Sequence, residues 1–140
     1  MRTWRNLSKL ATAAVLVTVL ALSGSSAASA EESRALTCGS QVWLDGIRAL
    51  AISENGRDEV YMLDGNGNKI WPAGAAYVSM AVNQRVEVDK CVPANAFLAL
   101  WEEDTAGFDD SLGGVSLIGD VTRDYTFIGG GGSYRLGVIA

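Results

Sequence analysis

The chain contains no histidine and little proline, cysteine or positive charge. Its 140 residues include two prolines, two cysteines, and 11 basic against 16 acidic side chains. Without histidine the chain has no Ser-His-Asp or Cys-His triad, no histidine-ligated zinc and no imidazole general base. Carboxylate or lysine chemistry remains, and only Lys69 and Lys90 follow the N-terminal segment. We expect a protein that acts by binding, and we assign no catalytic residue.

The first 30 residues have the composition of a secretory signal peptide. Three basic residues precede an apolar run from Leu10 to Leu22, and the small residues 28–30 follow it. The apolar run is shorter than the roughly 20 residues that a membrane-spanning helix needs. We predict export with cleavage after Ala30, a secreted extracellular product and no transmembrane segment.

Cleavage at this position would leave an acidic chain. It removes Arg2, Arg5 and Lys9 and no acid, so 8 basic residues remain against 16 acidic ones, a formal charge of -8. Such a surface repels phosphate backbones and attracts cations. We expect no nucleic-acid partner, and a divalent metal ion or a basic protein is a natural partner.

The two cysteines follow the predicted signal peptide, so they would reach an oxidising compartment. An even pair of cysteines in an exported protein usually forms a bridge. We predict the disulfide Cys38–Cys91, which should stabilise the fold by roughly 4 kcal/mol through the entropy of the unfolded chain.

Short apolar runs broken by Gly, Asn and Asp at intervals of about ten residues indicate an all-β fold. No window has sustained helical periodicity. We predict one antiparallel β-sandwich over residues 41–140, preceded by an N-terminal arm at 31–40. The predicted strands are 42–44, 48–53, 59–63, 69–71, 77–82, 85–88, 97–101, 114–118, 124–128 and 134–139.

Two glycine-containing segments have the composition of hairpin loops. Residues 64–68 superficially resemble an EF-hand loop, but Lys69 and Ala75 occupy the positions that require glycine and glutamate. We predict a tight turn with Asn-Gly at its tip. Residues 129–132 are four consecutive glycines, which we interpret as a flexible hairpin loop between the last two strands.

The strongest functional signal is an acidic segment at residues 102–110. It contains five carboxylates between two apolar runs, so a strand-loop-strand unit would gather them around one small volume. Like charges held that close favour a hard cation such as Ca²⁺, which takes six to eight oxygen ligands. The alternative is a solvated acidic turn.

This segment resembles the third calcium-binding loop of C-two domains, which are calcium-binding β-sandwich modules. Those loops commonly read Trp-Asp-x-Asp, a short gap, then Asp-Asp-x-Ile/Leu-Gly, and Glu102 replaces the first aspartate here. The matching residues are Trp101, Asp104, Asp109, Asp110, Leu112 and Gly113. The resemblance implies a C-two-like sandwich in which Glu102, Asp104 and Asp110 are ligands. It does not extend to membrane docking, because only Phe108 is large enough to insert.

Residues 53–61 are similar to the first calcium-binding loop of the same family. Asp58 fits the second ligand of that loop, whereas Glu54 lies closer to it than the family's first aspartate would. The candidate calcium site therefore consists of the following carboxylates: Asp58, Glu102, Asp104, Asp109 and Asp110.

Other functions remain open from the sequence. A small glycosidase is disfavoured, because about 110 residues leave little surface for a long sugar-binding cleft. A carbohydrate-binding module would need an exposed aromatic side chain, and Trp71 beside Pro72 is the candidate. A secreted protease inhibitor or interaction protein is a further alternative. The extracellular ligand could be a protein, a polysaccharide or a cell surface.

Overall fold

The computed structural model describes residues 38–104, 107–119 and 121–140. The predicted signal peptide and most of the predicted arm lie outside these ranges. Within them the chain forms nine strands and no α-helix. The strands are β1 (Gln41–Ala51), β2 (Asp58–Asp64), β3 (Lys69–Trp71), β4 (Val78–Met80), β5 (Arg85–Pro93), β6 (Phe97–Glu102), β7 (Asp110–Ser116), β8 (Arg123–Gly129) and β9 (Gly132–Ile139).

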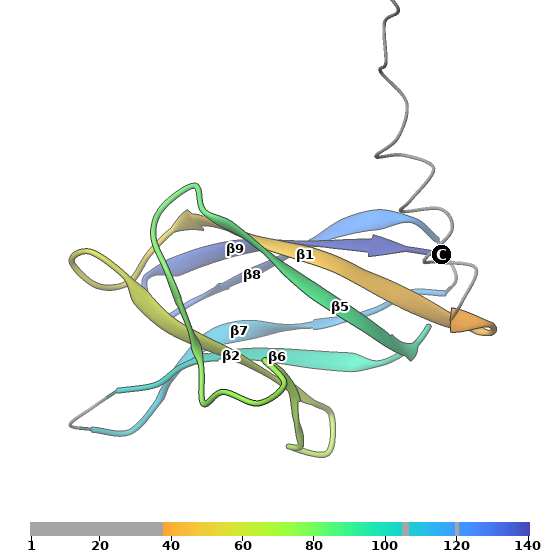
Figure 1. Ribbon diagram of the computed structural model, residues 1–140, viewed down its shortest axis with the longest axis horizontal. Helices are drawn as coiled ribbons and strands as arrows, with labels where there is room; N and C mark the ends of the chain where they lie inside the picture. The colour runs from red at the N-terminus through yellow and green to blue at the C-terminus, as the bar shows by residue number, and fades with distance from the viewer. Residues whose placement is uncertain (1–37, 105–106, 120) are drawn as a thin grey trace, which may run out of the picture.

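The strands form two antiparallel sheets that face each other, which confirms the predicted fold class. One sheet has the order β5-β1-β9-β8, and the other has the order β3-β2-β6-β7 with β4 paired to β2. Figure 1 shows the two layers, with β1, β8 and β9 above β2, β6 and β7. Strands adjacent in sequence often lie in different layers, so loops from both sheets meet at each end.

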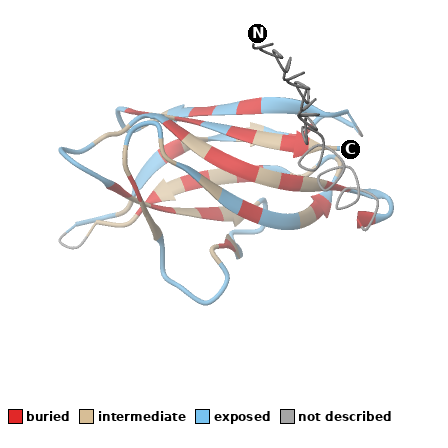
Figure 2. Ribbon diagram, turned by 45° about the horizontal axis from the view of Figure 1, so that its top comes forward, coloured by how far each residue is buried: buried red, intermediate tan, exposed pale blue. Residues whose placement is uncertain are grey.

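Alternating apolar side chains build the core between the sheets. In β9 the buried residues Tyr134, Leu136 and Val138 alternate with partly or fully exposed ones, and β6 contributes Leu98 and Leu100 in the same way. The buried positions recur along every long strand in Figure 2. A period of two is the pattern that a strand with one buried face requires.

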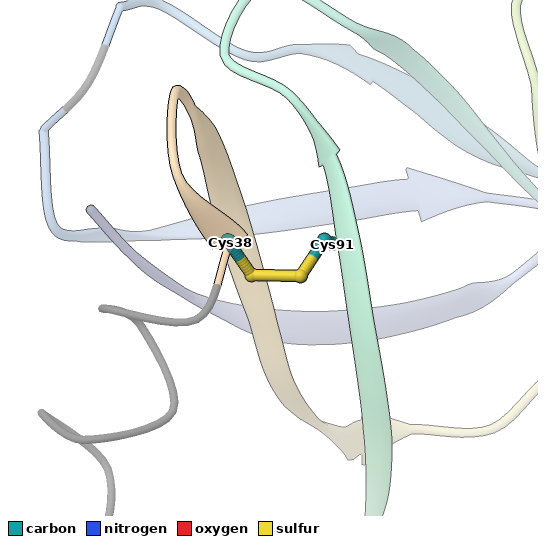
Figure 3. The surroundings of a disulfide bond; sticks show 2 residues. All are labelled: Cys38 and Cys91. Carbon is teal, nitrogen blue, oxygen red and sulfur yellow. A yellow bond between two sulfur atoms is a disulfide. The ribbon is translucent and has the colours of Figure 1, made fainter.

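The disulfide Cys38–Cys91 is present as predicted. It joins the residue three positions before β1 to a residue near the end of β5, with a Cα–Cα distance of 5.5 Å (Figure 3). Because β1 runs from Cys38 towards Ser53, the disulfide and the loop that follows β1 lie at opposite ends of the sandwich.

Several strand boundaries differ from the sequence prediction. The first two predicted runs form the single strand β1, which continues through a β-bulge near Gly46. Strand β5 continues to Pro93, past Asp89, whose φ is positive at 51°. Strand β7 begins at Asp110, inside the predicted acidic loop, because its pairing with β6 continues past a bulge near Leu112.

Both predicted hairpins are present. At 64–68, Gly67 N–H donates to the Asp64 carbonyl oxygen, and Asp64 N–H donates to that of Asn68. The glycine run makes a two-residue turn at 130–131, and Gly129 and Gly132 belong to the strands. A Cβ on Gly129 would lie 2.7 Å from the Ser111 carbonyl oxygen, so this glycine is required for close packing of β8 on β7.

The predicted exposure of Trp71 is wrong. Only 5% of this residue is exposed, and its indole N–H donates to the Glu87 carbonyl oxygen at 3.1 Å. Pairing of β3 with β2 turns the ring into the core, where it reaches β5 of the other sheet. Trp71 is therefore a core residue and offers no sugar-stacking surface.

Candidate metal centre

Two carboxylates are buried at the end of the sandwich that lies away from the disulfide. Asp58 begins β2 and continues the buried row of Val60 and Met62, and Glu102 ends the buried row of β6. They are the only buried charged residues in the described ranges. Val60 pairs with Glu102 across the sheet, so antiparallel pairing brings the two carboxylates to the same end.

The hydrogen bonds of Asp58 connect one loop and both sheets. Its carboxylate accepts from the backbone N–H groups of Ser53 and Glu54 at 2.9–3.1 Å, and from the hydroxyl of Tyr134. Ser53 and Glu54 belong to the loop after β1, whereas Tyr134 lies on β9 in the opposite sheet. A buried carboxylate with this many donors is satisfied without a metal, and Asp58 therefore positions the loop.

Glu102 is only partly satisfied. The Ser53 hydroxyl donates to its Oε2 at 2.5 Å, while Oε1 is buried and has no hydrogen-bond partner. Burial raises the pKa of Glu102 from 4.5 to about 6, and the negative charges of Asp58, Glu54 and Asp104 act in the same direction. An unpaired buried carboxylate oxygen is costly, and a bound cation is one means of satisfying it.

Two further glutamates form a cluster with Glu102. Carboxylate oxygens of Glu54, Glu59 and Glu102 lie within 4.8 Å of one another, close enough to share one ion. Glu54 comes from the loop after β1, Glu59 from β2 and Glu102 from β6. The donor set is entirely oxygen, which suits a hard cation such as Ca²⁺, and the remaining coordination positions would be open to water or other oxygens.

The predicted calcium ligands occupy different environments. Asp104 is half-buried next to Glu102 and contributes to the raised pKa of that residue. Asp110 is exposed at the start of β7, directly opposite Glu102 in the strand pairing. Asp109 instead accepts a hydrogen bond from the Tyr61 hydroxyl at 2.5 Å. The structure thus brings Asp58, Glu102 and Asp104 to one end of the sandwich. The hydrogen bond between Asp109 and Tyr61 lies on the outer face of the β3-β2-β6-β7 sheet.

Two tyrosines are coupled to these carboxylates. Burial raises the pKa of Tyr134 well above its usual value, and the hydrogen bond to Asp58 adds to the shift. The pKa of Tyr61 is raised in the same way by burial, by its bond to Asp109 and by the charges of Asp109 and Glu103. Both hydroxyls therefore remain protonated donors at any physiological pH.

Sequence reasoning gave Glu54 little weight as a ligand and did not consider Glu59. Glu59 follows Asp58 directly, so simple alternation would place the two side chains on opposite faces of β2. The available signal was the Glu54–Glu59 spacing across a short loop, since a loop that returns the chain to the same end also returns its carboxylates. The sequence does not reveal how β2 pairs with β6, and this pairing is what brings Glu102 close to the two glutamates.

The described residues contain no helix long and apolar enough to cross a membrane. A scan against known protein families finds no family that matches the chain, and a search among curated proteins finds no significant match.

Proposed function

We propose that this protein is a secreted calcium-binding β-sandwich module that acts by binding rather than by catalysis. Two observations on the buried Glu102 carry the proposal: its Oε1 has no hydrogen-bond partner, and its carboxylate lies in a cluster with those of Glu54 and Glu59. The two-sheet antiparallel architecture is compatible with the C-two-like motifs of the sequence. These motifs place acidic loops at the same end of such a sandwich.

Within this proposal the three glutamates have distinct roles. The Ser53 hydroxyl donates to Oε2 of Glu102, which leaves Oε1 for the ion. Glu54 and Glu59 approach from the neighbouring loop and strand, and Asp104 adds negative charge nearby. Bound Ca²⁺ would supply positive charge that cancels the repulsion among these groups.

Asp58 serves the site indirectly. By accepting the backbone N–H groups of Ser53 and Glu54, it holds the loop in the conformation that presents the Glu54 side chain. The ordered loop and the end of β6 together would then form a surface for an extracellular ligand. The acidic character of the chain favours a cationic or polar partner on that surface.

The proposed site is tested by calorimetric titration with Ca²⁺ and Mg²⁺ at neutral pH. Ca²⁺ should bind more tightly than Mg²⁺, because Mg²⁺ demands a stricter octahedral geometry and releases its water reluctantly. Glu102→Gln should weaken Ca²⁺ binding by an order of magnitude or more, as should Glu54→Gln combined with Glu59→Gln. The matched control is Glu87→Gln, on β5 of the other sheet.

A second pair of variants separates this ligand set from the set implied by the family motif. If Asp104→Asn combined with Asp110→Asn abolishes binding while Glu54 and Glu59 are dispensable, calcium binds at the family positions. No heat of Ca²⁺ binding, or binding that is unchanged in Glu102→Gln, would refute the proposed site.

Export is the second part of the proposal. It rests on the basic, apolar and small-residue order of the first 30 residues, and the disulfide Cys38–Cys91 is in keeping with it. N-terminal sequencing of the protein recovered from culture medium should begin at Glu31. Recovery of the uncleaved chain from the cytosol would contradict export.

A further inference from the structure

A second candidate site lies on the outer face of the β3-β2-β6-β7 sheet, separate from the glutamate cluster. Here Tyr61 of β2 pairs directly with Trp101 of β6, and both side chains point away from the core. Residues 107–109, just before β7, border this pair, and Asp109 accepts the hydrogen bond from the Tyr61 hydroxyl. The result is an open hollow of about 520 Å³ lined by Tyr61, Leu63, Trp101, Gly107, Phe108 and Asp109.

The lining combines aromatic rings with negative charge. It contains one tyrosine, one tryptophan and one phenylalanine, and its only charged group is Asp109. Glu103 is near enough for its charge to raise the pKa of Tyr61. Asp104 lies beside Gly107, because a Cβ added to Gly107 would be 3.7 Å from the Cβ of Asp104. No lysine or arginine is among the described residues that line the hollow, and none of the salt bridges in the described ranges involves Asp109.

Phe108 has no packing role that explains its position. It is 97% exposed, the largest exposed fraction among the large apolar residues described. Placing a phenylalanine in water has an energetic cost that a ligand or partner can offset. Phe108 is nevertheless one of the residues that line the hollow.

We propose that this hollow binds an organic cation, of the class of a guanidinium or an alkylated ammonium group. Aromatic faces attract such cations through their negative quadrupole, and a guanidinium group also stacks on rings and pairs with a carboxylate. An anionic ligand would meet the carboxylate of Asp109 and no lysine or arginine among the described lining residues. A sugar could not accept hydrogen bonds from the Trp101 indole N–H, which is buried, or from the Tyr61 hydroxyl, which already donates to Asp109.

The test compares cations with neutral molecules of the same shape, in EDTA so that the outcome is independent of the glutamate cluster. Methylguanidinium is compared with methylurea, and choline with 3,3-dimethylbutan-1-ol, by chemical-shift titration and tryptophan fluorescence. Each cation should bind about 3- to 30-fold more tightly than its neutral partner. The shifts should centre on Trp101 and Phe108.

Two variants and one control locate the site. Phe108→Ala and Asp109→Asn should each weaken cation binding several-fold, because one removes a ring and the other removes the charge. Ile128→Ala, a 74% exposed residue on β8 of the other sheet, should leave binding unchanged. Equal affinity for the neutral partners, binding of neutral disaccharides instead, or no binding of any probe at tens of millimolar would each overturn the proposal.

Discussion

The hydroxyl of Tyr134 on β9 donates a hydrogen bond to the buried carboxylate of Asp58 on β2, and this bond joins the two sheets at the end of the core. The two residues are separated by 76 positions in the sequence. Asp58 in turn holds the backbone of Ser53 and Glu54. Stability of the fold and position of the candidate metal centre therefore depend on the same carboxylate.

Tyr134→Phe should lower the free energy of unfolding by about 2 kcal/mol, because it removes a buried donor to a charged acceptor and leaves the ring in place. Tyr61→Phe is the matched control, since it removes a hydrogen bond to a carboxylate that is only partly buried and should cost less than about 1 kcal/mol. Urea unfolding measures both. Equal losses in the two variants would show that the Tyr134 hydrogen bond stabilises the fold no more than the Tyr61 hydrogen bond does.

The raised pKa of Glu102 predicts an unusual pH dependence. The unfolded chain ionises this group near 4.5, and the folded protein near 6. Between these values the folded state holds a proton that the unfolded state has lost, so the contribution of Glu102 to stability is present at low pH and is lost as pH rises towards 6. The total loss is about 2 kcal/mol.

This dependence is measured as the difference in unfolding free energy between the metal-free protein and Glu102→Gln from pH 4 to 7. The variant should be the more stable of the two above pH 6, and the difference should shrink as pH falls. Because Ca²⁺ binding requires the ionised carboxylate, affinity for Ca²⁺ should also fall below about pH 6. A constant difference across the range would mean that Glu102 ionises normally.

Gly129 tests the close contact between β7 and β8. In Gly129→Ala the new Cβ would lie 2.7–2.9 Å from backbone atoms of Ser111, Leu112 and Gly113, which cannot move without disturbing the strand. We expect a loss of about 1–3 kcal/mol in unfolding free energy. Gly65→Ala is the control, because its Cβ would make an ordinary contact at 3.5 Å. Similar unfolding curves for both variants would argue against this packing.

The disulfide should contribute stability without affecting the candidate metal centre. It links residues 53 positions apart, so replacing both cysteines with alanine should lower the free energy of unfolding by roughly 4 kcal/mol. Calcium affinity should be unchanged in the folded fraction, because Cys38 and Ser53 lie at opposite ends of β1. A large change in affinity would indicate that the two ends of the sandwich are coupled.

Most of the fold could be predicted from the sequence because its signals are local. Alternating apolar residues predict strands, and Asn-Gly at 64–68 predicts a turn, from only a few neighbouring residues. The disulfide could be predicted because the chain has only two cysteines. The bulge near Gly46 and the extension of β5 past Asp89 could not, because polar residues interrupt the pattern there while backbone pairing continues.

The candidate site was predictable only in part for a related reason. The acidic segment identified Glu102 and the similarity of the first loop identified Asp58, but their different roles depend on partners far away in the sequence. Tyr134 satisfies Asp58, whereas Glu102 keeps one oxygen without a partner. Likewise, the exposure of Trp71 was predicted wrongly because its burial depends on contact with β5 in the opposite sheet.

The melting temperature in EDTA, in millimolar Ca²⁺ and in millimolar Mg²⁺ tests the central claim most directly, because a ligand that binds the folded state must raise stability by mass action. We predict a rise with Ca²⁺ that is larger than the rise with Mg²⁺ and is lost in Glu102→Gln. An unchanged melting temperature in Ca²⁺, or the same rise in Glu102→Gln as in the unaltered protein, would contradict a calcium site built on this buried glutamate.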